Sequence, residues 1–277
     1  MIAISKTDFE RYVPVATQPE DSTEVFAMMQ HGLLAAWMQV KNDILGADIA
    51  YGLENGDIDA TSDIMRETKA LICMQAFANA IRRNDLILTP TGFGIVNTDK
   101  VAPASRERVN ALVEELTQHI YDSYDALIDD LVGVEDWYES SVAEQCIPTV
   151  FYHIGDYKRY ASAEHATYFV RTDPKVRSAN YFLIQHIGKD FNEELLTAIR
   201  TNDVTADQAK VIDMMRRFIG GKLTDNRYAV RAAYDELINT LDTNLDTYPT
   251  YANSEAYRLN HFDHYANAAE DPCYFFG

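Results

Sequence analysis

Positive charge is scarce in this chain. Its 277 residues contain 24 Lys and Arg against 43 Asp and Glu, for a formal net charge of −19. Proteins hold nucleic acid chiefly by placing Lys and Arg against phosphates, and the basic blocks here are no longer than pairs such as Arg82-Arg83 and Arg216-Arg217. Sequence-specific DNA binding is therefore disfavoured. The acidity is also what a soluble surface without any partner would show.

Cysteine and long hydrophobic runs are scarce as well. Cys73, Cys146 and Cys273 are odd in number, widely spaced and without a neighbouring His. This excludes a disulfide framework and a zinc site, and fits a reducing compartment. Residues 25–40 form the longest run without a charge, but they are too polar for a membrane span. Residues 1–5 lack the features of a secretory signal. We expect a protein made in the cytoplasm, with no membrane contact.

Catalytic signatures are missing too. Residues 88–109, LTPTGFGIVNTDKVAPASRERV, suggest a phosphate-binding loop at first sight. A dinucleotide fingerprint needs a glycine at the sixth position, where Asn97 stands, and no Gly-Lys-Ser/Thr follows. The carboxylates form no specific pair, and no G-x-S-x-G elbow occurs. We predict no enzyme activity and no cofactor.

One pair of histidines is the only hint of a metal site. His261 and His264 are three residues apart with Asp263 between them. No HExxH signature and no third ligand at a suitable spacing accompany them. We interpret them as a solvated or interface pair and predict no metal.

Helical periodicity, by contrast, is abundant. It predicts helices over about 22–40, 61–83 and 104–131, with Pro103 or Ser105 starting the third. Asp173-Pro174 starts a further helix, which Gly188 breaks. Thr205 to Gln208 form a capping box at the start of the helix after that. Gly220-Gly221 is expected to interrupt or end the helix that follows this box. Two further expectations are a polar loop at 52–59 and a core position for residues 70–74.

Residues 86–97 predict a β-hairpin between two long helices. Short β-prone runs flank Pro90, which suits a tight turn, and Gly92 accepts positive φ at little cost. The hairpin is either a plain connection or an arm that packs on the adjacent subunit. In the second case the contact residues are Thr91, Gly92, Phe93 and Ile95.

Residues 247–277 differ from the rest, being rich in Tyr and Asn and poor in aliphatic residues. They predict an extended C-terminal arm, ending in Tyr274, Phe275 and Phe276, that either tucks back on its own domain or docks on a neighbour. The predicted fold is thus mainly α: a bundle of long helices with a small hairpin and this arm. Residues 1–246 form the helical body, with a possible sub-boundary at about 132–172.

The stretch TGFGIV, followed by APASRERV, resembles an uncharacterised family encoded in the virion-structural modules of phages and prophages of Bacteroides-type gut bacteria. The resemblance covers about residues 85–130 and brings no catalytic residues. It implies a head–tail connector or adaptor located at the neck of the virion. Such proteins form a homo-oligomeric ring that contacts the portal and neighbouring neck or tail proteins, and an acidic lumen would let DNA pass without sticking.

Three alternatives stay open beside the connector. The first is another virion component, such as a tail-completion or minor head protein. The second is a small metal-dependent hydrolase built on carboxylates or on His261 and His264. The third is a cytoplasmic interaction module without any role in a virion.

Overall fold

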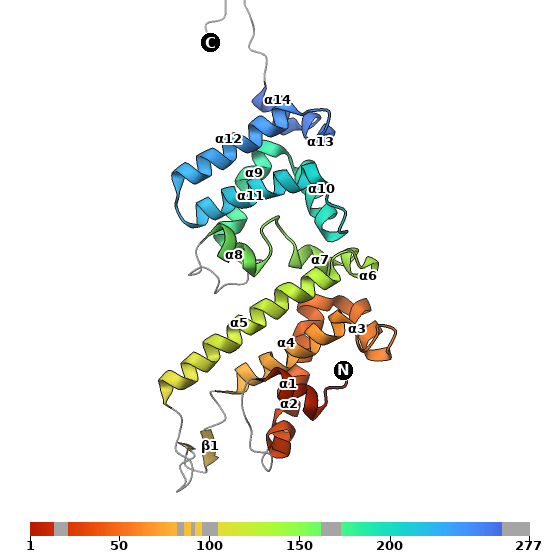
Figure 1. The fold of residues 1–277 in the computed structure, drawn as a ribbon, viewed down its shortest axis with the longest axis vertical. Coiled ribbons are helices and arrows are strands. Elements are labelled where there is room, and N and C mark those ends of the chain that lie inside the picture. Colours follow the sequence, from red (N-terminus) through yellow and green to blue (C-terminus); the bar gives the residue numbers. More distant parts are fainter. Residues whose placement is uncertain (14–21, 82–85, 90–91, 96–104, 162–172, 262–277) are drawn as a thin grey trace, which may run out of the picture.

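The computed structural model describes residues 1–13, 22–81, 86–89, 92–95, 105–161 and 173–261. It is mainly α-helical, as the sequence predicts, and its helices form two lobes stacked along the long axis (Figure 1). The possible sub-boundary at 132–172 falls in the region where one lobe passes into the other.

The N-terminal lobe is built around one helix, α4, which packs against both α2 and α5. Residues 70–74 of α4 are all buried, which confirms their predicted core position. The elements of this lobe are α1 (Lys6–Tyr12), α2 (Ser22–Val40), the π-helical turn η1 (Lys41–Leu45), α3 (Gly46–Asn55), α4 (Asp63–Ala80), α5 (Arg106–Leu131), α6 (Glu135–Tyr138) and α7 (Ser141–Cys146).

The C-terminal lobe is built around α11, which packs against α8, α9 and α12. Its buried residues recur at helical spacing from Val211 to Ile219. The elements are α8 (Ile154–Tyr160), α9 (Pro174–Ile187), α10 (Lys189–Arg200), α11 (Ala206–Leu223), α12 (Arg227–Thr243), α13 (Pro249–Ala252) and α14 (Glu255–Asn260).

The predicted helix starts are confirmed where a side chain caps the helix. Ser105 accepts a hydrogen bond from the Arg108 N–H at the start of α5, and Asp173 caps α9 in the same way. Thr205 and Gln208 form both bonds of the capping box at the start of α11. These caps act over two or three residues, so the local sequence suffices to predict them.

Two local predictions are wrong. The expected loop at 52–59 begins only at Gly56, because Leu53 is buried and α3 continues to Asn55. The helix expected to break at Gly220-Gly221 continues through both as α11. A side chain at Gly220 would collide with the backbone carbonyl of Tyr160, so this glycine lets α8 approach α11.

The strands β1 (Leu86–Thr89) and β2 (Gly92–Ile95) pair antiparallel, with Leu86 opposite Ile95 and Thr89 opposite Gly92. They lie at the end of the molecule that is farthest from α14 (Figure 1). The turn residues 90–91 are outside the described residues.

The sequence predicts that the C-terminal arm begins at residue 247, but the structure shows helices there. Residues 249–260 form α13 and α14, and α14 packs on α9. The side chains of Tyr248 and Tyr251 are buried beside Phe191, so aromatic residues here belong to the core of the lobe. Residues 262–277 lie outside the described residues.

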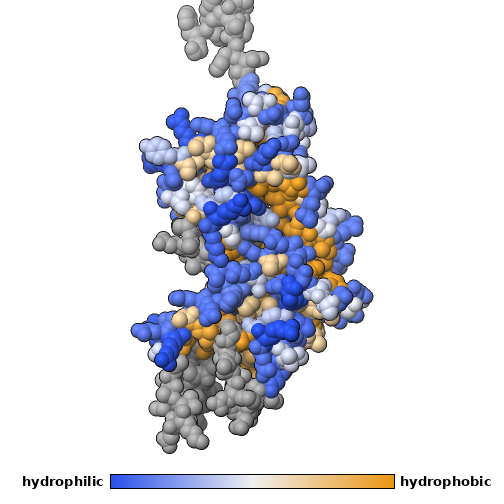
Figure 2. Space-filling view, viewed as in Figure 1, coloured by the Kyte–Doolittle hydropathy of each residue, from blue (hydrophilic) through white to orange (hydrophobic). Residues whose placement is uncertain are grey.

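The face drawn in Figure 2 is largely hydrophilic, with a hydrophobic band reaching the surface on its right-hand side from α10 toward α6. Of the helices that the structure describes, none combines the length and the hydropathy needed to cross a membrane.

Replacing Gly220 with Ala should lower the free energy of unfolding by about 1–3 kcal/mol, because the added methyl group forces α8 and α11 apart. Gly32→Ala in α2 is the matched control. Its methyl group would meet only ordinary contacts at 3.6 Å and beyond, so alanine's higher helix propensity should leave stability unchanged or raise it by up to about 1 kcal/mol. Urea unfolding of both variants measures the difference. Equal effects would show that the α8–α11 approach does not depend on Gly220.

Candidate functional site: a polar junction and an uncharged helix face

The contact residues predicted from the sequence are only partly visible. Gly92, Phe93 and Ile95 lie on β2, where the backbone alone is described. Thr91, Tyr274, Phe275 and Phe276 lie outside the described residues, so their roles stay predictions.

The histidine pair is likewise half visible. His261 follows α14, where its Nε2 lies 3.1 Å from Asp242 Oδ2 and its ring stacks on Tyr257. These contacts give His261 a structural role in holding α14 against α12. His264 lies outside the described residues, and within them no group of three or more His, Cys, Asp or Glu is arranged to hold a metal ion.

A polar junction joins the two lobes, and Asp125 of α5 is its centre. The carboxylate accepts hydrogen bonds from the N–H groups of Ile154, at 2.9 Å, and Gly155, at 2.7 Å. These are the first two residues of α8, whose N–H groups have no partner within the helix. A negative charge at this end also suits the helix dipole. Asp125 therefore fixes the start of α8 against the N-terminal lobe.

Arg216 of α11 holds the other side of the junction. Its Nε donates to the carbonyl of Val150 at 2.8 Å and lies 3.7 Å from Asp156 Oδ2. Its guanidinium lies over the ring of Tyr152, 5.4 Å from the centroid. One side chain thus links α11, α8 and the segment that connects the lobes.

The connecting segment, residues 147–153, is part of the core. Ile147, Val150 and Phe151 are fully buried. Complete burial of such side chains stabilises a fold by roughly 1.5–3 kcal/mol each. The lobes are therefore joined through packed hydrophobic side chains as well as through polar contacts.

Burial controls the charges in this junction. It raises the pKa of Asp125 and of Asp156 above the usual value, although backbone hydrogen bonds and neighbouring cations oppose the shift. For His153, burial disfavours the charge, but the Asp129 carboxylate 3.0 Å from its Nε2 and the other nearby carboxylates outweigh burial and raise its pKa. Burial also raises the pKa of Tyr152, to about 12.

A cleft of about 530 Å³ opens beside the junction, between the end of α5, α8 and α11. Several groups that line it have partners: Asp129 pairs with nearby His153, and Tyr160 Oη donates to Asp213 at 2.8 Å. Arg159 lies over the ring of Tyr160. These contacts give the cleft a structural role, because they link α5, α8 and α11 to one another.

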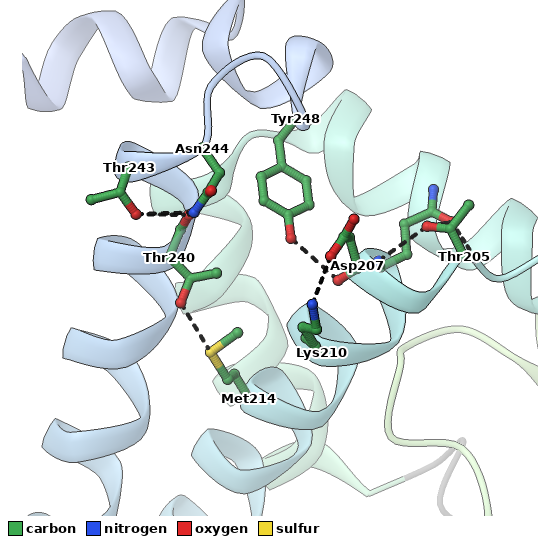
Figure 3. Close-up of polar contacts among 9 residues, drawn as sticks. Thr205, Asp207, Lys210, Met214, Thr240, Thr243, Asn244 and Tyr248 are labelled. Carbon is green, nitrogen blue, oxygen red and sulfur yellow. Dashed lines mark hydrogen bonds and ion pairs between the residues drawn. The ribbon is translucent and has the colours of Figure 1, made fainter.

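The start of α11 and the end of α12 are tied together by a second set of contacts (Figure 3). Tyr248 Oη donates to the Asp207 carbonyl at 3.3 Å, and Lys210 Nζ contacts the Asp207 carboxylate at 2.8 Å. Thr240 on α12 points its hydroxyl at Met214 Sδ on α11. Tyr248 therefore packs against the C-terminal lobe, at a position where the sequence predicts an extended arm.

Helix α2 presents an uncharged apolar face to solvent. Its inner face packs on α4 and is buried, as the periodicity predicts. Its outer face was not predicted, and it carries Ala27, Met28, Gln30, His31, Leu34, Ala35, Met38 and Gln39. Met28 is 72% exposed, and Leu34 and Met38 are each 48% exposed. The charge-free run at 25–40 is the sequence signal that could have revealed this face.

The fold and these surfaces define a two-lobed, mainly α-helical protein with an acidic surface and one uncharged helix face. The chain belongs to a family of unknown function, DUF6712, whose model matches residues 29–147 and 222–260, more than half of the chain. No curated protein and no solved structure matches it significantly.

Replacing Asp125 with Ala should lower the free energy of unfolding by about 1–3 kcal/mol, because the α8 N–H groups lose a charged acceptor. Asp122→Ala is the matched control on the same helix. Its carboxylate is 60% exposed and pairs with Lys158 at the surface, so a loss below about 1 kcal/mol is expected. Chemical unfolding of both variants measures the contrast, and similar losses would contradict the role of Asp125 in the junction.

Proposed function

We propose that this protein is a phage virion structural protein, a head–tail connector or adaptor. Its copies form a homo-oligomeric ring between the portal and the tail, through which the DNA passes. The virion assignment rests on the resemblance of residues 85–130 to an uncharacterised family encoded in the virion-structural modules of phages and prophages. In this proposal the ring contacts include the hairpin and the aromatic C-terminal residues, namely Thr91, Gly92, Phe93, Ile95, Tyr274, Phe275 and Phe276.

The observation that supports self-association is the outer face of α2. Each copy carries a net charge of −19, so acidic surfaces of two copies repel one another within the Debye length of about 8 Å at physiological salt. The outer face of α2 carries no charge along residues 25–40 and exposes Met28, Leu34 and Met38. A helical stretch of this length offers a contact of about 24 Å. In a ring each contact joins two different surfaces of neighbouring copies. An uncharged face can meet the acidic surface of its neighbour without opposing like charges, so we assign this face to the contact with the adjacent copy.

The acidic remainder of the surface suits a channel for DNA. Nucleic acid is retained where Lys and Arg displace its counterions, and a net negative lining offers few such sites. The DNA would therefore move through the ring without sequence-specific contact. The same surfaces also suit another virion component, such as a tail-completion or minor head protein. A metal-dependent hydrolase has less support, because the described residues contain no group of three or more His, Cys, Asp or Glu that could hold a metal ion.

The protein should be present in purified virions in a stoichiometric ratio to the portal, located at the neck. Quantitative mass spectrometry of gradient-purified particles measures the ratio, and a map of the neck gives the location. Absence from the particles would eliminate both the connector and the other virion roles.

The double substitution Met28→Glu and Leu34→Glu should weaken ring formation at least tenfold, because it places like charges at the proposed contact. Native mass spectrometry and light scattering over a concentration series measure the assembly. Tyr51→Glu with Tyr181→Glu is the control, since both tyrosines are 65% exposed on other helices and the change in charge is equal. A ring that tolerates the α2 pair as well as the control pair would contradict our assignment of this face.

A further inference from the structure

The C-terminal lobe contains an aromatic pocket whose charge is opposite to that of the protein. The pocket, about 530 Å³ in volume, lies between α9, α11 and α12. We call it the cationic pocket. Phe182, Phe218 and Tyr234 form its apolar wall, with the two phenylalanine rings stacked at 5.5 Å. Phe182 remains 40% exposed, so the wall is open to a further apolar group.

The charges around the cationic pocket are mainly positive. Lys222, Arg227 and Arg231 line it, against the single carboxylate of Asp225. Lys222 lies over the rings of Phe182 and Phe218, and Arg231 pairs with exposed Asp235 at 3.5 Å. A cluster of cations beside open aromatic rings recognises a segment that combines carboxylates with aromatic side chains.

Residues 262–277 of this chain have that composition. They contain the acidic residues Asp263, Glu270 and Asp271 and no Lys or Arg. Their five aromatic residues are Phe262, Tyr265, Tyr274, Phe275 and Phe276. The segment is therefore complementary to the cationic pocket in both charge and side-chain type.

The described chain also ends next to this pocket. Asn260, at the end of α14, donates from Nδ2 to the carbonyl of His186 at 3.3 Å. The ring of His186 lies 4.4 Å from that of Phe182 and 5.3 Å from that of Tyr234, which are both part of the pocket wall. Sixteen extended residues can span about 50 Å. The segment that follows α14 thus has ample length to enter the cationic pocket of its own chain.

We propose that residues 262–277 dock in the cationic pocket of the same chain, with aromatic side chains on Phe182 and Tyr234 and the acidic residues facing Arg227 and Arg231. Covalent linkage gives the segment an effective concentration on the order of millimolar at the pocket, so it outcompetes a separate partner of equal affinity. This inference concerns the free subunit and does not depend on the proposed ring. In such a ring the same segment would leave its pocket to reach a neighbour.

Photo-crosslinking of the full chain tests the proposal. Phe275 is replaced by benzoylphenylalanine, the protein is irradiated at low micromolar concentration, and the products are analysed by gel electrophoresis and peptide mass spectrometry. We expect crosslinks to peptides of α9, α11 and α12 that line the cationic pocket, in a band of monomer size. The same probe at Tyr51, in the other lobe, should give no crosslink to these peptides.

Charge reversal supplies the second measurement. Arg227→Glu with Arg231→Glu should reduce the pocket crosslink at least fivefold, whereas Lys175→Glu with Lys189→Glu, an equal change in net charge outside the pocket, should not. Glu270→Lys with Asp271→Lys should restore the crosslink to the reversed pocket.

Crosslinks elsewhere, crosslinks between chains only, or none at all would overturn the proposal. So would equal yields from the pocket and control reversals. The measurement uses the free subunit, so its failure would leave the virion assignment untouched, and absence from virions would leave the docking result untouched.

Discussion

The Asp125 carboxylate at the start of α8 is the contact on which the arrangement of the lobes depends. It accepts hydrogen bonds from two backbone N–H groups that have no partner within the helix, and so fixes α8 against α5. A steric contact then positions α11 against α8: the two helices meet at Gly220, where only a hydrogen atom fits against the Tyr160 backbone. Because α11 is the centre of the C-terminal lobe, this half-buried carboxylate and the buried segment 147–153 together position the helices that follow. Arg216 completes the junction from the opposite side.

The distribution of charge connects this fold to its proposed role. A net charge of −19 keeps copies apart over most of the surface, so association requires places where the charge is absent or reversed. The part of the chain that the structure describes offers an example of each: the outer face of α2, which is uncharged, and the cationic pocket, which is positive and aromatic. They lie in different lobes. In the proposed ring the first surface meets a neighbouring copy, whereas in the free subunit the second holds the chain's own C-terminal segment.

The sequence was informative about local structure and less so about the surfaces. The caps at Ser105, Asp173 and Thr205 were predictable, as was the buried face of α2. The junction was not, because Asp125 and its partners Ile154 and Gly155 are about thirty residues apart and carry no motif. The cationic pocket was missed for the same reason, since its wall combines side chains from three helices. The charge-free run at 25–40 is a sequence signal for the outer face of α2, in addition to excluding a membrane span.

What the sequence by itself determined is the mainly α-helical class and the start of several helices, because periodicity and capping act between residues two to four positions apart. Tertiary structure decided which apolar side chains remain exposed to solvent. It also decided that Gly220 is a contact and not a break, and that Tyr248 and Tyr251 belong to the core and not to an arm. Each of these outcomes depends on surfaces that meet only after distant segments pack together. The sequence around a glycine or a tyrosine does not show which distant residues it will contact in the folded protein.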